Sequence, residues 1–257
     1  MTRQAPGDTA AGFVWPRVRS VAPGALGRWL RAGWADLAAL RSASLFYGVV
    51  MAAMGMLLQR NTSGAMGLGL MTGFLLVGPF LACGLYDLSR RRAAGEPCQW
   101  RCSLFAWRSN LPAMSFFAVA LTLLLAAWLR ISVVVVALAF PEGSPSWTDP
   151  STLGFAVIYI AAGAGFALFV FGCCALGLPL LLARTDLDPI SAAICSMTAL
   201  RRHPGLMIRW AATIVLATAL GFATAGLGLV LTVPLIGHMT WHACCEIIDA
   251  HPDGANP

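Results

Sequence analysis

The sequence contains no lysine, and only 11% of its 257 residues are charged, against roughly 25% in an ordinary soluble domain. All seventeen basic residues are arginines. Hydrophobic residues make up 58% of the chain, and its mean hydropathy is +0.75. This balance excludes an ordinary soluble domain and predicts an all-α protein whose solvent is the lipid bilayer.

Several motifs of known chemistry are also missing. The chain has no Walker loop, no G-x-S-x-G elbow and no H-E-x-x-H helix. Its acidic residues lie at the ends of the apolar segments or between them, whereas a proton relay usually places them inside. The net charge of +6 is not gathered with aromatics on one basic face, so a nucleic acid partner is not expected. We therefore expect no catalytic residue and no enzyme.

Six apolar segments are long enough to cross a bilayer as helices of about 20 residues. The predicted spans are residues 44–59, 66–86, 112–129, 153–182, 206–224 and 226–245. The first is short, so its helix is expected to begin before residue 44 or to thin the bilayer locally. The sequence thus predicts a polytopic membrane helix bundle with six transmembrane helices.

A short phrase recurs three times, at residues 35–42, 102–109 and 195–202, each time before a pair of predicted spans. Arg41, Arg108 and Arg201 occupy the same place in the three copies. This spacing predicts three repeats, at about residues 23–88, 96–184 and 188–248. Each would be an amphipathic interfacial helix followed by a hairpin of two spans, arranged about a pseudo-threefold axis.

The three amphipathic helices carry different sequence signals. In the first, Leu26, Trp29, Leu30, Trp34, Leu37 and Leu40 repeat at three- and four-residue steps, with Asp36 largely off that stripe. In the second, residues 96–110, one face is predicted to hold Cys98, Cys102, Phe105 and Ser109. In the third, Asp188 can cap a helix that ends at His203.

Arginines mark the orientation of the spans. They precede the first span and flank the links between spans two and three and between spans four and five. This excess predicts that both termini are cytoplasmic. Residues 1–22 and 251–257 are expected to be disordered tails around a membrane domain of residues 23–250. Arg130 ends the third span, and residues 131–140 are expected to lie along the outer interface or to continue a tilted helix. Arg130 itself either snorkels at the outer interface or forms a functional polar site.

Prolines recur in the even-numbered spans, at Pro79, Pro179 and Pro234. Proline removes a backbone hydrogen bond, so a helix kink is expected at each position. Shared kinks of this kind serve either packing or gating.

His238 and His242 are the best candidates for chemistry, because histidines four residues apart share a helix face and can share a metal. Two ligands are too few for a metal or haem site, and the alternative is an interfacial polar cluster anchored by Trp241. The eight cysteines are expected to be reduced, and no cofactor is predicted.

Arg90, Arg91 and Arg92 directly follow the second predicted span. Clustered juxtamembrane arginines bind lipid phosphates, and they also serve as topology signals with local partners such as Asp87 and Glu96. The lipid bilayer is the expected partner in both interpretations, and anionic lipids are an expected partner only in the first.

Four segments carry a family resemblance: residues 78–91, 95–97, 179–182 and 237–243. With them, residues 26–248 closely resemble bacterial predicted integral membrane proteins catalogued as a domain of unknown function, number twenty-one eighty-nine. The resemblance implies a six-helix protein of the bacterial inner membrane and supplies no catalytic residues.

The sequence therefore favours a non-catalytic structural or accessory membrane protein. Two alternatives stay open. The first is a small transporter or channel with a path along the kinked even spans, and the second is a metal- or haem-binding redox protein that uses His238 and His242. Self-association into a homo-oligomer is compatible with the glycine-rich spans.

Overall fold

Helices form most of the described residues in the computed structural model, which describes residues 15–60, 64–97, 100–141 and 152–249, with backbone alone for residues 59, 64–77 and 79. In chain order the elements are β1 (Arg17–Val18), α1 (Ala25–Ala39), α2 (Arg41–Arg60), α3 (Gly64–Ala93), α4 (Trp100–Ser103), the 3-10 helix η1 (Ala106–Asn110), α5 (Leu111–Ala139), α6 (Leu153–Cys174), α7 (Gly177–Ala183), α8 (Pro189–Arg202), α9 (Pro204–Ala223), α10 (Leu229–Ile247) and β2 (Ile248–Asp249). Apart from the two-residue strands, the all-α prediction is confirmed.

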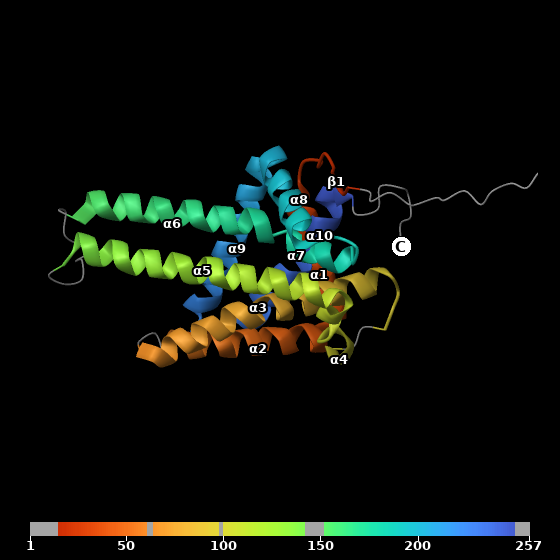
Figure 1. Ribbon diagram of the computed structural model, residues 1–257. Helices are drawn as coiled ribbons and strands as arrows, with labels where there is room; N and C mark the ends of the chain where they lie inside the picture. The colour runs from red at the N-terminus through yellow and green to blue at the C-terminus, as the bar shows by residue number, and fades with distance from the viewer. Residues whose placement is uncertain (1–14, 61–63, 98–99, 142–151, 250–257) are drawn as a thin grey trace, which may run out of the picture.

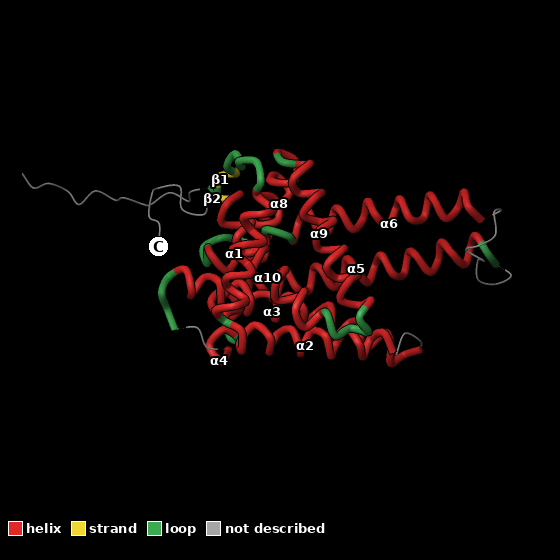
Figure 2. The backbone as a smooth tube through the Cα atoms, turned by 180° about the vertical axis from the view of Figure 1, so that it is seen from behind, coloured by secondary structure: helices red, strands yellow, loops and turns green. Residues whose placement is uncertain are grey.

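The long and short helices are separated along the molecule. The hairpins α2–α3 and α5–α6 point in one direction, while α1, α4, α7 and α8 gather at the other end (Figure 1). The view from behind shows the same division, with β1 and β2 beside the short helices (Figure 2). The largest buried side chains, including Trp29, Leu180, Met207 and Trp210, come mainly from helices at this end, so the protein core lies there.

Four helical stretches of the described residues are long and apolar enough to cross a membrane: Arg41–Leu58, Trp100–Ala139, Leu153–Ala183 and Pro204–Ala223. They correspond to four of the six predicted spans, and the protein is a helical membrane protein. Most of the predicted span 66–86 lies where the structure describes the backbone alone. The predicted span 226–245 is not among the four stretches, because His238, Thr240 and His242 lower the apolar content of α10. The first predicted span does begin early, at Arg41.

The three short amphipathic helices differ more than the repeated phrase suggested. α8 agrees with the prediction: Asp188 accepts hydrogen bonds from the amides of Ile190 (2.9 Å) and Ser191 (3.0 Å), and the helix ends before His203. The hydroxyl and amide of Ser191 hold the pKa of Asp188 below its usual value. The single helix predicted over residues 96–110 is wrong, because α4 and η1 are two short pieces.

α1 is a helix as predicted, but it buries only part of its apolar stripe. Trp29 and Leu37 of the stripe are buried, whereas Leu30 and Trp34 are about half exposed. Asp36, which lies largely off the stripe, is buried as well. The reason is a polar partner set on α3 and α10, described below.

α10 lies at the centre of the contacts made by α1, α2, α3 and α9. Pro234 stands inside this helix and cannot donate a hydrogen bond to the carbonyl of Val230, four residues earlier. Gly48 of α2 packs directly against that carbonyl: a Cβ at Gly48 would lie 2.0 Å from the Val230 oxygen. The proline in α10 thus coincides with a close approach of two backbones.

α5 and α6 meet through aromatic rings. Trp128 stacks on Phe166 with ring centroids 4.9 Å apart, and Phe140 meets Phe155 edge-on at 5.0 Å. Outward-facing residues on this hairpin are strongly exposed, as Leu138 is at 78%, which suits contact with lipid. α5 continues through the exposed Arg130 to Ala139, so of the two expected courses the residues after Arg130 follow the continued helix.

The two ends of the described chain pair with each other. β1 and β2 are antiparallel, and Arg19 forms an ion pair with Asp249 at 2.8 Å. The predicted disordered tail of residues 1–22 is therefore wrong for Arg17–Val18, which has a fixed partner. Residues 1–14 and the tail 251–257 lie outside the described residues.

Candidate functional site: a buried polar cluster

Six polar side chains from four helices converge beneath α1, and we call them the polar cluster. They are Asp36 of α1, Ser44 of α2, Ser89 and Arg92 of α3, and His238 and His242 of α10. Asp36, Ser44, Ser89 and His238 are each at most 3% exposed. Burial of so many polar groups is tolerated only when they bind one another.

Close helix packing lets these short side chains meet. Gly33 lies one turn before Asp36 on α1, and a Cβ there would stand 2.8 Å from the side chain of Met239. The absence of a side chain at Gly33 brings α1 against α10, next to His238 and His242.

The hydrogen bonds of the polar cluster have one direction. Ser89 donates its hydroxyl proton to Asp36 Oδ2 (2.6 Å), since an ionised carboxylate can only accept. Ser89 Oγ therefore accepts from His238 Nδ1 (2.7 Å). His238 is fully buried, which favours the neutral ring, so the opposite ring nitrogen, Nε2, accepts from Ser44 Oγ (2.8 Å). The chain of bonds runs from Ser44 through His238 and Ser89 to Asp36, and it assigns His238 as a neutral ring protonated at Nδ1.

Asp36 has two further partners. His242 Nε2 lies 2.8 Å from Asp36 Oδ2, and Arg92 forms an ion pair with Asp36 Oδ1. Burial favours the neutral acid, but the hydrogen bonds from His242, Ser89 and Arg92 outweigh it and hold the pKa of Asp36 below its usual value. The carboxylate is therefore ionised at neutral pH.

A serine hydroxyl bound to a neutral imidazole is the arrangement that activates serine nucleophiles. In the polar cluster, however, the hydroxyl of Ser44 has no solvent-exposed surface. The ring of His238 also contacts Ser89 in place of a carboxylate. The geometry can order helices and relay a proton, and it offers no surface on which a substrate could reach Ser44.

The histidine prediction is confirmed as a shared helix face but not as a metal site. Both rings point to the polar cluster, and the two nitrogens of His238 are each taken by a serine. The described residues contain no group of three or more His, Cys, Asp or Glu side chains that could hold a metal. Trp241 is only 6% exposed, so it does not anchor the cluster at an interface as expected.

The three arginines after the second predicted span do not form one open patch. Arg90 and Arg91 both bind Asp87, at 2.7 and 2.6 Å, and both approach Glu96. The hydrogen bond to Asp87 raises the pKa of Arg91. Arg92 turns instead to Asp36. Asp87 and Glu96 are the local partners named in the topology-signal interpretation. The proposed lipid-phosphate role of the three arginines stays untested.

The recurring prolines and arginines lie in unlike settings. Pro179 stands in α7 and cannot bond the carbonyl of Ala175, where α6 gives way to α7. Pro79 lies within α3, and its side chain is outside the described part. Arg41 begins α2, Arg108 lies over the Phe105 ring at 4.4 Å, and Arg201 borders an apolar groove.

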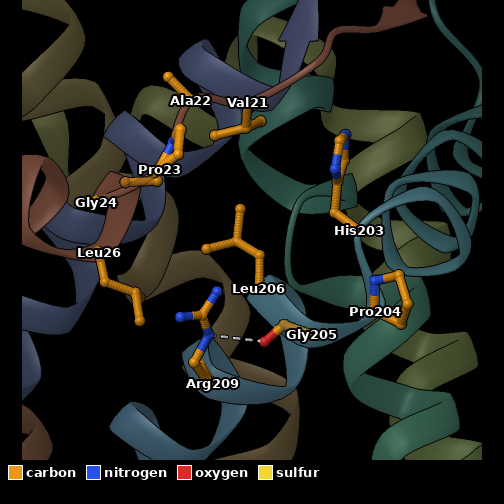
Figure 3. A pocket seen from close by; sticks show the side chains of 11 residues that line it. Val21, Ala22, Pro23, Gly24, Leu26, His203, Pro204, Gly205, Leu206 and Arg209 are labelled. Atoms are coloured by element: carbon orange, nitrogen blue, oxygen red, sulfur yellow. Dashed lines mark hydrogen bonds between the residues drawn. The ribbon is translucent and has the colours of Figure 1, made fainter.

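A separate surface pocket of about 350 Å³ lies between the segment before α1 and the start of α9 (Figure 3). Its polar side chains are already engaged: Arg209 Nε donates to the carbonyl of Gly205 (3.0 Å), and His203 Nε2 lies 2.8 Å from the carbonyl of Arg19. The pocket joins the N-terminal segment to the α8–α9 junction and brings no acid–base pair together.

Sequence reasoning missed Asp36, Ser44 and Ser89 as members of the polar cluster. Serine is too common in membrane helices to stand out. Asp36 itself could have indicated a buried polar site, because it is an acidic residue in a helix that otherwise carries apolar residues and arginines. Its partner His242 lies 206 residues away, so local spacing could not reveal the pair.

The comparisons with known proteins give one match. Residues 67–183 match a family model described as predicted integral membrane protein (DUF2189). No curated protein and no solved structure matches the chain. The matched range includes Ser89 and Arg92, whereas Asp36, Ser44, His238 and His242 lie outside it. Over residues 67–183 the match confirms the resemblance found in the sequence, to the predicted integral membrane protein family (DUF2189).

Proposed function

We propose that the chain is a six-span protein of the bacterial inner membrane, with three repeats of a short interfacial helix followed by a hairpin. The order of elements supports this: α1 precedes α2–α3, α4 and η1 precede α5–α6, and α8 precedes α9–α10. The short helices and β1–β2 gather at one end (Figure 1), where arginines are frequent. By the positive-inside rule that end, with both termini, is cytoplasmic.

Its role, in this proposal, is structural or accessory and non-catalytic. The polar cluster carries the argument, because its buried groups bind one another and join α1 to three long helices. Asp36 alone receives bonds from Ser89, Arg92 and His242. Such a cluster fixes the interfacial helix on the bundle, and it keeps Ser44, Ser89 and His238 buried.

Proton flux in liposomes tests this role. Purified wild-type protein and a His238→Ala variant are reconstituted with a trapped pH-sensitive dye, and a pH step is applied. The proposal expects wild-type vesicles to leak no faster than empty ones. A wild-type flux that His238→Ala abolishes would overturn it.

That second result would establish proton conduction and would favour the second candidate, a small transporter or channel. The observation that favours it is the directional chain from Ser44 through His238 and Ser89 to Asp36, since each link can pass a proton along its hydrogen bond. His242 and Arg92, both partly exposed, connect this chain to the cytoplasmic side.

A metal- or haem-dependent redox role is the third possibility and needs ligands at His238 and His242. Metal analysis and a visible spectrum of the detergent-purified protein test it against a His238→Ala, His242→Ala double variant. Stoichiometric metal or a haem band that the double variant loses would establish this role. A colourless, metal-free wild-type protein excludes it.

A further inference from the structure

An apolar groove of about 620 Å³ lies between α5, α6 and α8. Its walls include Phe116 and Leu124 of α5, Phe169 and Cys173 of α6, and Met197 of α8. α8 stands at the end of the α5–α6 hairpin where the short helices gather (Figure 1). The volume lies in the range of roughly 300–1,000 Å³ that is usual for small-molecule sites.

The groove exists because α8 has two apolar faces. One face, with Ala192, Cys195 and Ala199, is buried in the protein. The other carries Ile190 and Ile194, which are 62% and 49% exposed. Met197 and Arg201 continue this second face at helical spacing and line the same groove. An interfacial helix with a second open apolar face leaves hydrocarbon contacts for a lipid to make.

Arg201 supplies a charge at the edge of this apolar surface. It makes no ion pair with a carboxylate of the described residues, unlike Arg92 with Asp36 and Arg184 with Asp186. A guanidinium binds phosphate oxygens bidentately, and basic sites between membrane helices bind anionic lipid headgroups. A phospholipid fits an apolar wall that has, at its rim, an arginine without a carboxylate partner among the described residues.

We propose that the groove binds one anionic phospholipid from the leaflet on the side of the short helices, with an acyl chain along α5 and α6 and its phosphate on Arg201. This site is distinct from Arg90, Arg91 and Arg92, whose guanidinium groups are paired with carboxylates. It does not depend on which side of the membrane is cytoplasmic, or on the role of the polar cluster.

Native mass spectrometry of the full-length protein in detergent tests the site. The protein is titrated with phosphatidylglycerol, and with phosphatidylcholine of the same acyl chains. Arg201→Ala removes the cation, and Arg130→Ala is the matched control on an exposed arginine outside the groove. Ala120→Trp fills the groove, and Ala126→Trp places the same side chain on another face of α5.

The expected result is a preference of the wild type for phosphatidylglycerol that Arg201→Ala weakens about fivefold, equivalent to about 1 kcal/mol. Ala120→Trp should reduce binding of both lipids, and the two control variants should bind as the wild type does. Equal binding of both lipids by wild type and Arg201→Ala would overturn the proposal. So would equal losses in Arg201→Ala and Arg130→Ala. Should Ala120→Trp fail to fold, the arginine pair decides the matter alone.

Discussion

Replacing Asp36 by alanine tests whether the polar cluster holds the molecule together. The substitution removes the acceptor of Ser89, His242 and Arg92 at once and leaves a buried hydroxyl donor at Ser89 without its partner. In the wild type the Asp36 side chain is only 5% exposed, so water cannot replace it without opening α1.

The cost follows from the exposure of the partners. Removing one member of a fully buried ion pair costs about 3–5 kcal/mol. The side chains of Arg92 and His242 are 38% and 27% exposed, so both can regain water, and the estimate falls to about 3 kcal/mol. For a chain of this size that loss lowers the Tm by about 6–12 °C.

Thermal unfolding in mild detergent measures the effect, with Glu96→Ala as the control. Glu96 pairs with Arg90 and Arg91, but it is 43% exposed, so its loss should cost less than about 0.5 kcal/mol. If the Tm of Asp36→Ala lies within about 2 °C of the Tm of Glu96→Ala, the polar cluster does not contribute the stability argued for it.

The difference in Tm between the wild type and Asp36→Ala should also depend on pH in a defined way. Asp36 has a lowered pKa in the folded state, so its stabilisation is complete above the pKa of the unfolded chain, near 4, and disappears as the pH falls through the folded pKa. The gap in Tm between wild type and Asp36→Ala should be constant from neutral pH to about pH 4 and close below it. A gap that widens on acidification contradicts the assignment.

Other expected outcomes concern packing, capping and thiol access. Gly48→Ala places a Cβ 2.0 Å from the Val230 carbonyl oxygen and should destabilise the protein by about 3 kcal/mol or more. Gly27→Ala, whose Cβ would have nothing within 4 Å, should be neutral or stabilising. Similar Tm values for the two variants would refute the close approach of Gly48 to Val230. Asp188→Ala should cost about 1 kcal/mol through loss of the α8 cap, seen as a lower Tm. In the folded protein a maleimide should label the exposed Cys102 and spare the buried Cys244, and equal labelling would contradict the fold.

The helical elements were largely predictable because each rests on local signals. Apolar length placed four spans that the structure supports, and Asp188 with Pro189 marked the start of α8. The helix expected over residues 96–110 failed because its buried residues, Ser103, Ala106 and Asn110, do not follow the apolar stripe. Six spans and the threefold repeat stay predictions.

The polar cluster was predictable only in part, for a physical reason. His238 and His242 were found from their spacing on one helix, but their partners come from α1, α2 and α3. Those contacts depend on how closely the helices approach, which glycines such as Gly33 decide in three dimensions. A single sequence does not report that distance.

The long reach of α10 has a consequence for biogenesis. The last helix supplies the partners of the first: His242 meets Asp36, Glu246 meets Arg28, and β2 pairs with β1. Until α10 has been synthesised, Asp36 has no histidine partner and Gly48 faces no Val230. The nascent protein must therefore keep Asp36 and one face of α2 without these partners until α10 is made, and a chain truncated before α10 is expected to be degraded by membrane proteases.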